Sequence, residues 1–443
     1  MHFISGLPRA GSTRPAAVYK QLEALMCFFS MHCRRLADSC LTLIFCLALL
    51  SAPVSASQDL NAAASEEIVF NNFSNQIILI KEQSQQYLIK GTEQRVTLSD
   101  RIIVKASQSI TKDKLYQYHS QISNVSELFT GSQNIFYSLS LHNENSLADV
   151  LNILQNKPGI GLVQPDILQL KNKSDAKLSN AHVNPYIERL GIPSLWKSTK
   201  GAGVKIAIID DGFNLQHAEL SHVTPVFSYD SESRALSSLP LSTIDSHGTK
   251  VAGIIFAAHN NVGINGIAPE AELITLRQPD SWTSNTLLSF QLAKLAGADI
   301  INCSWQTHYL LQPIADVVNE LASQGRGGKG IAVIFSSGNQ GREITALSTE
   351  AAIASAIVVG ASGHDFTKPL GFSNFGQSVD ILAYGLPVKT TLAVGGYGLF
   401  SGTSLSAAVV AGLSALIISQ QPDIQLEQLL HTLQSITTGS DLG

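Results

Sequence analysis

Six short apolar runs after residue 203 of this 443-residue chain constrain its fold more than any other feature. Runs that are apolar throughout are typical of strands buried on both faces of a sheet. Helical stretches separate several of them, such as 287–295 and 314–323. This alternation predicts an α/β domain with a doubly wound, mainly parallel sheet. The six runs are 204–210, 273–277, 299–305, 331–337, 357–361 and 379–383.

Polar residues stand where the predicted strands and helices begin or end. Asp210 closes the first run, His247 precedes a helical apolar stretch, and Ser404 precedes a helix of small residues. Asn339 follows the strand at 331–337. Ligands of doubly wound sheets bind beyond the carboxyl ends of the strands, so we expect these side chains at that edge.

These residue types are the parts that acyl transfer needs. A serine hydroxyl requires a neighbouring base, and histidine has a suitable pKa for taking its proton and returning it. A buried aspartate orients the imidazole, while an asparagine amide can donate to the oxyanion. Each residue alone is weak evidence, but the chain order Asp210, His247, Asn339, Ser404 matches one known geometry.

Several motifs resemble those of the subtilisin family of serine endopeptidases, from about Val183 to the end of the chain. They are IAIIDDGF, DSHGTKVAGIIFA, NNVGINGIAP, FSSGNQG, LGFSNFG and SGTSLSAAVVAG. The resemblance implies a triad of Asp210, His247 and Ser404, and an oxyanion hole formed by Asn339 and the Ser404 backbone N–H. It also implies polypeptide substrates bound as an extended strand. The residues implied to flank the primary specificity pocket are Ser304, Trp305, Gln306, Ser336, Ser337 and Gly338.

The first 56 residues are interpreted as a leader. Basic residues precede an apolar run at 41–50, and small residues end at Ala56, as in a secretory signal peptide. The true start is either Met1 or Met31. The alternative is a core helix or an uncleaved anchor, although ten residues are short for a membrane span. We therefore expect a secreted or periplasmic protein with no stable membrane span after leader removal.

Residues 57–170 predict a small α+β unit. The expected elements are, in chain order, a strand at 101–105, a helical stretch at 111–122, a strand at 135–141, a helix from Ser146 and a strand at 160–170. This unit is loosely similar to the family's propeptide, which implies an intramolecular chaperone and inhibitor. The polar segment 171–184 is predicted to be a linker cut by the enzyme itself, and 185–443 to be the peptidase domain.

Charge and cysteine content exclude other classes of protein. The net charge of −5 argues against a nucleic-acid partner. Four of the five cysteines lie in the leader, so no disulfide is expected within the mature chain, and Cys303 is expected to be an inert core residue. No cofactor or metal site is predicted, since Glu219 offers one carboxylate near 260–263 where Ca²⁺ wants six to eight oxygens.

Two functions remain open from the sequence. The first is an exported serine endopeptidase made as a pre-pro-protein. The alternative is a subtilase-fold binding protein that is catalytically silent or cuts only itself.

Overall fold

The fold is described from a computed structural model, which describes residues 66–172, 184–242 and 244–438. The leader predicted at 1–56 lies outside these residues, as does most of the linker predicted at 171–184. The described chain contains two main sheets, one antiparallel and one parallel. The predicted combination of a small α+β unit and a doubly wound α/β domain is therefore confirmed.

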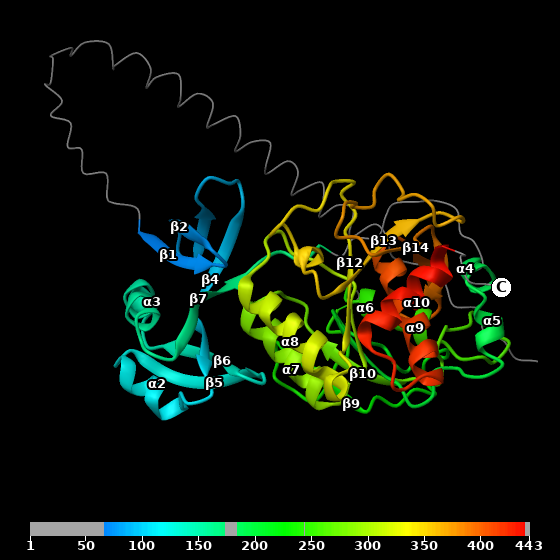
Figure 1. Ribbon diagram of the computed structural model, residues 1–443, viewed down its shortest axis with the longest axis horizontal. Coiled ribbons are helices and arrows are strands. Elements are labelled where there is room, and N and C mark those ends of the chain that lie inside the picture. The colour runs from blue at the N-terminus through cyan, green and yellow to red at the C-terminus, as the bar shows by residue number, and fades with distance from the viewer. Residues whose placement is uncertain (1–65, 173–183, 243, 439–443) are drawn as a thin grey trace, which may run out of the picture. The chain divides into compact units, whose positions relative to one another are not determined.

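The N-terminal part is an antiparallel sheet in the order β1-β2-β3-β4-β6-β5, with β7 paired to β4 (Figure 1). The long β4 joins the two halves of this sheet, because it pairs with β3, β6 and β7. The strands are β1 (Glu67–Asn72), β2 (Asn75–Gln83), β3 (Gln86–Ile89), β4 (Arg95–Ser107), β5 (Ile122–Thr130), β6 (Asn134–Leu141) and β7 (Ile160–Leu168).

Two short helices pack on this sheet. In α2 (Lys112–Tyr118) the Thr111 hydroxyl accepts a hydrogen bond from the Lys114 N–H, which caps the first turn. In α3 (Leu147–Gln155) the apolar residues recur at helical spacing, so one face is buried against β7 and β1. That face consists of Leu147, Val150, Leu151 and Leu154.

The order of strands and helices in this part was only partly predicted from the sequence. The predicted helical stretch at 111–122 is shorter in the structure, because β5 begins at Ile122. The pairing of β5 with β6 shifts register twice, and its buried residues Ile122, Val125 and Leu128 are consequently spaced three apart. That spacing is typical of a helix rather than a strand. The alternation of apolar and polar residues that predicts a strand is therefore missing from β5.

The second part is a parallel sheet in the order β14-β13-β12-β11-β8-β10-β9. Six of its strands coincide with the six predicted apolar runs, and the edge strand β9 was not predicted. The strands are β8 (Lys205–Asp210), β9 (Phe227–Asp230), β10 (Glu272–Arg277), β11 (Ile300–Cys303), β12 (Ala332–Ser336), β13 (Ile357–Ser362) and β14 (Ile381–Tyr384).

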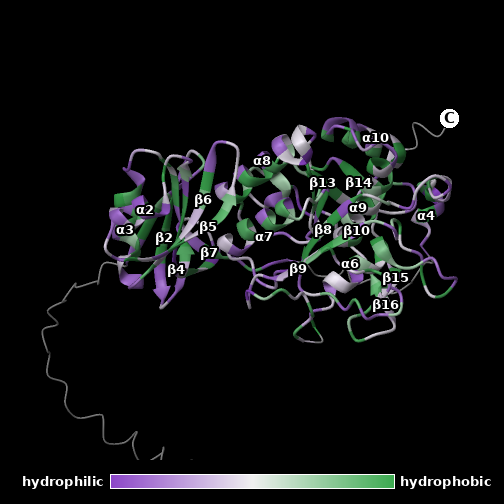
Figure 2. Ribbon diagram, turned by 90° about the horizontal axis from the view of Figure 1, so that it is seen from below, coloured by the Kyte–Doolittle hydropathy of each residue, from purple (hydrophilic) through white to green (hydrophobic). Residues whose placement is uncertain are grey.

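Helices cover both faces of this parallel sheet. In β8, Ile206 and Ile208 belong to one apolar cluster, whereas Ala207 and Ile209 belong to another. The first cluster contains residues of α6 (His247–Phe256), α9 (Thr403–Gln420) and α10 (Leu426–Thr438). The second contains residues of α7 (Thr283–Leu295) and α8 (Gln312–Gly328). Figure 2 shows hydrophobic residues along the central strands, as burial on both faces requires.

The helix α9 lies in the core of this part. It is apolar and long enough to cross a membrane, but 89% of it is buried within the protein, where it contacts α6 and five strands of the sheet. Small residues such as Ala407 and Gly412 permit this close packing. A Cβ at Gly412 would lie 2.7 Å from the Ile267 side chain.

Buried polar contacts attach the antiparallel sheet to the parallel-sheet part. The carboxylate of Asp166 in β7 is fully buried and accepts hydrogen bonds from the backbone N–H and the hydroxyl of Ser284, at 2.9 and 2.8 Å. Arg101 donates to the same carboxylate at 2.7 Å. The Asp166 carboxylate thus accepts hydrogen bonds from the first turn of α7 and also balances the charge of Arg101 in β4.

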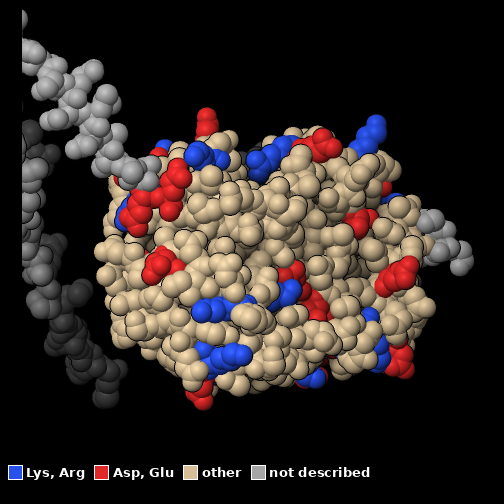
Figure 3. All heavy atoms as spheres, turned by 60° about the vertical axis from the view of Figure 1, so that its left-hand side comes forward, with Lys and Arg blue, Asp and Glu red and all other residues tan. Residues whose placement is uncertain are grey.

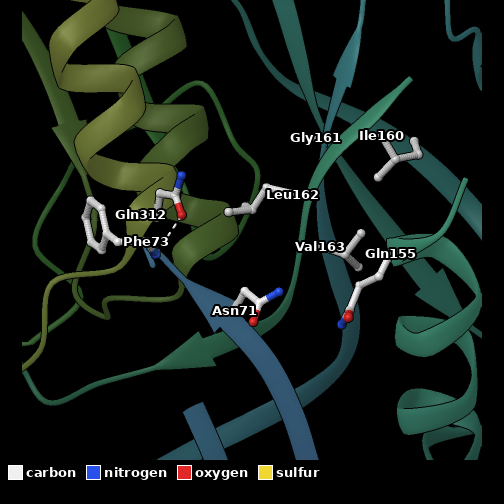
Figure 4. A pocket seen from close by; sticks show the side chains of 8 residues that line it. All are labelled: Asn71, Phe73, Gln155, Ile160, Gly161, Leu162, Val163 and Gln312. Atoms are coloured by element: carbon white, nitrogen blue, oxygen red, sulfur yellow. Dashed lines mark hydrogen bonds between the residues drawn. The ribbon is translucent and has the colours of Figure 1, made fainter. Parts of the chain in front are cut away.

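The end of β1 meets the start of α8. The Asn72 side chain accepts from the backbone N–H of Gln312 at 2.7 Å, and the Phe73 N–H donates to the Gln312 side chain at 2.7 Å. Figure 4 shows this second bond beside a pocket that β1, β7 and α8 line together. The cluster of apolar residues around α7 and α8 also includes residues of β1–β7, so the two parts share a core.

The hairpin of β15 (Val388–Thr391) and β16 (Tyr397–Phe400) depends on a glycine in α6. Thr390 and Thr391 donate to the carbonyls of Lys250 and Thr249, and a Cβ at Gly253 would lie 2.3 Å from the Thr391 hydroxyl. We predict that Gly253→Ala lowers the free energy of unfolding by about 1–3 kcal/mol in chemical denaturation, because overpacking must displace the hairpin.

Gly363→Ala is the matched control for that change. A Cβ at Gly363 meets nothing within 4 Å, and its backbone does not have a positive φ. We expect its unfolding free energy to stay within about 0.5 kcal/mol of the parent's. Equal stability of both variants would contradict the packing argument.

Candidate active site

Three predicted residues stand at the ends of regular elements in the parallel-sheet part. Asp210 is the last residue of β8, His247 is the first residue of α6, and Ser404 is the second residue of α9. All three are at least 93% buried, with exposed fractions of 1%, 7% and 2%. Rigid elements therefore hold each side chain.

Asp210 and His247 form a buried pair. The Nδ1 atom of His247 lies 2.8 and 3.0 Å from the two carboxylate oxygens of Asp210. With Nδ1–H donating to the carboxylate, Nε2 is left as the basic nitrogen of the imidazole. The ring of Phe400 contacts the imidazole edge-on, with 5.5 Å between the ring centroids.

Asp211, the next residue, fixes the backbone of the histidine. Its carboxylate accepts from the N–H of Gly248 at 2.9 Å and from the N–H of His247 at 3.3 Å. Its own N–H donates to Asp210 at 2.8 Å. Because Ser246 provides no side-chain cap for α6, Asp211 takes this role from a distant part of the chain.

Arg277 lies beside this pair on the neighbouring strand. It pairs in register with Asp210, and its side chain is only 3% exposed. The guanidinium contacts Asp230 and Glu232 at 2.9 Å each and Asp245 at 3.4 Å. Asp245 stands two residues before His247, so this network connects the loop that leads into α6 to the end of β10.

The Ser404 hydroxyl donates to the backbone carbonyl of Ser304 at 2.9 Å, and the Ser304 hydroxyl donates to the carbonyl of Ser404 at 3.1 Å. This reciprocal pair holds the start of α9 against the end of β11. Gly402 precedes the helix with φ +91°, a conformation that favours glycine. The first N–H groups of an 18-residue helix thus lie next to the hydroxyl.

Asn339 lies at the same helix start. Its side-chain oxygen accepts from the N–H and from the hydroxyl of Thr403, both at 3.0 Å. These two bonds set the orientation of the amide, since they assign its oxygen to Thr403. A Cβ at Gly402 would lie only 3.0 Å from the Asn339 Nδ2 atom, so glycine permits this approach.

The predicted pocket residues lie on two adjacent segments. Ser304, Trp305 and Gln306 follow β11, while Ser336 ends β12 and Ser337 and Gly338 follow it. The strands β11 and β12 pair in parallel, so the two segments follow neighbouring strands. A Cβ at Gly338, where φ is +103°, would lie 2.0 Å from the Gln306 side chain. The two segments are therefore in direct contact.

Asn374 contacts the segment that follows β12 and was not predicted from the residues alone. Its amide donates to the carbonyl of Ser337 and to the Gln340 side chain, each at 2.9 Å. Its oxygen accepts from the N–H groups of Gln340 and Arg342. The motif LGFSNFG contains this residue, so the family pattern marked the position without indicating its contacts.

A segment of the N-terminal part pairs with the predicted pocket. Asn172 and Gln306 exchange two backbone hydrogen bonds in antiparallel orientation, at 2.8 and 3.3 Å. The preceding Lys171 extends its side chain toward Trp305, whose ring is fully buried. The end of this segment thus pairs with Gln306 as an added strand does.

The Glu219 carboxylate is hydrogen-bonded within the protein. One carboxylate oxygen accepts from the Tyr397 hydroxyl at 2.6 Å and from the Ile264 N–H at 3.1 Å. The hydrogen bond to Glu219, and then burial, raise the pKa of Tyr397 to about 12. Among the described residues, no group of three acidic, histidine or cysteine side chains could hold a metal.

Cys303 is buried at the end of β11, as expected. Burial raises the pKa of its thiol well above the usual value, which disfavours the nucleophilic thiolate. Its place in the core agrees with a structural residue.

We predict that Asp211→Ala lowers the unfolding free energy by about 1–2 kcal/mol, because two N–H groups at the start of α6 lose their acceptor. Asp211→Asn, which keeps one acceptor oxygen, is expected to lose less. Denaturant unfolding of the parent and the two variants measures this ranking of unfolding free energies. An unchanged midpoint for Asp211→Ala would contradict the capping role.

Comparison with known proteins extends these observations. The model of the subtilase family matches residues 201–441, more than half of the chain. Subtilisin NAT from Bacillus subtilis subsp. natto is 31% identical over 262 residues, which are 57% of this chain and 66% of that relative. The chain therefore matches slightly less than two thirds of that relative's length.

Two further comparisons differ in how much of the chain they cover. Alkaline elastase YaB from Bacillus sp. (strain YaB) is 26% identical over 382 residues, which are 85% of this chain and 92% of that protein. This match extends beyond the parallel-sheet part. A solved structure of a cold adapted subtilisin-like serine proteinase is 24% identical, with a TM-score of 0.45, and covers 60% of this chain and 88% of that one.

Proposed function

Because the chain belongs to the subtilase family, a family of serine-type endopeptidases, we propose that it is an exported serine endopeptidase made as a pre-pro-protein. The observation that supports the proposal is two sets of contacts at the ends of neighbouring strands. His247 pairs with Asp210 at the end of β8. Asn339 and Ser404 contact the start of α9 and the Ser304 carbonyl, which follows β11, the strand that pairs with β8.

In the proposed reaction, His247 takes the proton from Ser404 as the hydroxyl attacks a substrate carbonyl. Asp210 stabilises the resulting imidazolium through Nδ1–H. The leaving amine then receives the proton, and an acyl-enzyme remains until water, activated by the same histidine, releases the product. To act, the Ser404 hydroxyl turns from the Ser304 carbonyl toward Nε2 of the imidazole.

The developing oxyanion is stabilised by the Asn339 amide and by the N–H of Ser404 at the start of α9. The bonds from Thr403 to the Asn339 oxygen support this role, because they leave the amide N–H groups as the donors on the other side. Such preorganised donors favour the tetrahedral intermediate over the planar ground state.

Polypeptides are the proposed substrates, and the N-terminal part is proposed as an intramolecular inhibitor and chaperone. The antiparallel pairing of Asn172 with Gln306 supports both, since it occupies the backbone of Gln306 with another segment of the chain. Maturation is proposed within 171–184. On the face in Figure 3, basic and acidic side chains are few and interspersed, which gives no support to a nucleic-acid partner.

Export to the periplasm or the exterior rests on the leader pattern at 1–56. The match to alkaline elastase YaB covers 85% of this chain, so that relative also has residues that correspond to part of the N-terminal region.

A second candidate function is an enzyme that cuts only itself. The same pairing of Asn172 with Gln306 favours it, because a retained N-terminal part would keep other substrates out. The shared core between the two parts, in which β5 and β7 contact α7, would resist release.

We predict that Ser404→Ala abolishes both maturation of the precursor and hydrolysis of an unstructured protein, with turnover falling by at least about 10⁴-fold. Ser414→Ala is the control on the same helix, since its hydroxyl bonds the Val410 carbonyl within α9. Intact mass and casein hydrolysis are measured. An uncut, inactive parent would overturn the proposal, and cutting without turnover would favour self-processing alone.

We also predict that Asn339→Ala lowers kcat by about 10²–10³-fold and leaves KM nearly unchanged, because the lost donor acts on the transition state. Asn339→Asp keeps the acceptor for Thr403 but adds a negative charge, so it should be no faster. Steady-state kinetics on one peptide separate the two constants. A rise in KM at constant kcat would instead assign Asn339 to substrate binding.

A further inference from the structure

One arginine holds both ends of the loop that leads into α6. This loop, 231–246, begins after β9 and ends where the helix begins. The Nη1 atom of Arg277 lies 2.9 Å from a carboxylate oxygen of Asp230 and 2.9 Å from one of Glu232. The Nη2 atom lies 3.4 Å from Asp245, near the other end of the loop. The beginning and the end of the loop therefore meet on a single side chain.

Backbone contacts strengthen this closure. The N–H of Ser231 donates to the Arg277 carbonyl at 2.9 Å, so the main chain of the arginine also holds the start of the loop. At the other end, the Asp245 oxygen that faces the guanidinium also accepts from the Leu241 N–H at 3.1 Å. Because one oxygen receives both donors, a displaced guanidinium would also displace the turn that precedes α6.

The middle of the loop offers little other anchorage near the helix. Its residues 235–244 include no charged residue. Ser238 is buried, and its hydroxyl donates to Thr275 at 2.7 Å, which fixes the middle of the loop alone. Exposed aliphatic side chains bury little area and therefore contribute little to holding a loop. Four of them are 56–85% exposed here: Leu236, Leu239, Leu241 and Ile244.

Burial makes the contacts of the arginine costly to lose. The side chains of Arg277 and Asp230 are only 3% and 4% exposed. A buried charge that loses its partner is left unpaired, which destabilises the segment that carries it. Arg277 also pairs in register with Asp210, the proposed catalytic aspartate. The loop that ends at the proposed catalytic histidine is thus tied to the strand that lies beside β8.

We propose that Arg277 is a positioning residue for the proposed reaction. It holds the loop 231–246 closed, so that His247 enters α6 in the orientation that directs Nε2 toward Ser404. The proposal rests on the proposed endopeptidase function and adds a residue that touches neither the substrate nor the reacting atoms. It matters for rate because a misplacement of about 1 Å, even from a distant change, can cost roughly 10²-fold.

Steady-state hydrolysis of one peptide by the protein obtained from the full-length chain tests this role, with active enzyme counted by titration of the reactive serine. We expect Arg277→Gln to lower kcat by roughly 10- to 100-fold and to leave KM within about twofold. Arg277→Lys should recover only part of the loss, because one ammonium cannot bridge both ends of the loop. An unchanged kcat, or a rise in KM alone, would overturn the proposal. An inactive parent would instead overturn the endopeptidase function.

Arg326→Gln is the matched control for a purely structural effect. The Arg326 side chain is 5% exposed and contacts Asp299 at 3.1 Å and the Gly330 carbonyl at 3.3 Å. These partners stand just before β11 and β12, at the edge of the sheet opposite to the end of β8. We expect this variant to unfold more easily than the parent and to keep its kcat. Equal losses of kcat in the two arginine variants would contradict the positioning role.

Asp245→Asn tests the end of the loop next to α6, because asparagine keeps an acceptor for the Leu241 N–H and loses the charge. We expect kcat to fall several-fold. Combined with Arg277→Gln, it should add no further loss, since both changes remove the same contact. Losses that multiply would overturn the proposal. If circular dichroism shows that Arg277→Gln does not fold, a parental kcat in both Arg277→Lys and Asp245→Asn would overturn it.

Discussion

Burial of the parallel sheet on both faces is the constraint on which the rest of the structure depends. Successive residues of β8 point into two separate apolar clusters, so neither face of the strand has room for a polar side chain until Asp210 ends it. Chemistry is thereby confined to the edge where strands end and helices begin. The helices that cover the sheet also contribute, since α6 begins with His247 and α9 begins beside Ser404.

At that edge the buried polar groups stabilise one another through the backbone. Asp210 contacts the imidazole, Asp211 holds the N–H groups of the same turn, and Arg277 balances the acidic residues of the adjoining loop. A buried polar group without a partner is costly, so each of these contacts restricts how far its neighbours can move. The geometry of His247 is therefore set by more than its contact with Asp210.

The sequence predicts the parallel sheet well because its strands are apolar throughout, whereas it predicts the antiparallel sheet poorly. In β1 and β2 buried and exposed residues alternate among many polar ones, and in β5 two register shifts give a spacing of three. Asp211, Arg277 and Asn374 were missed for another reason. Their contacts join residues that are tens of positions apart, which no local pattern contains, while the proposed catalytic residues were predicted from the motifs around them.

The pairing of Asn172 with Gln306 has a consequence for how activity would depend on dilution. While both residues belong to one chain, their association is intramolecular, and its effective concentration is set by the chain that connects them rather than by how much protein is present. A cut beyond Asn172 would turn the same contact into a bimolecular one. Its occupancy would then fall as the protein is diluted, so dilution would raise the fraction of molecules in which Gln306 is accessible.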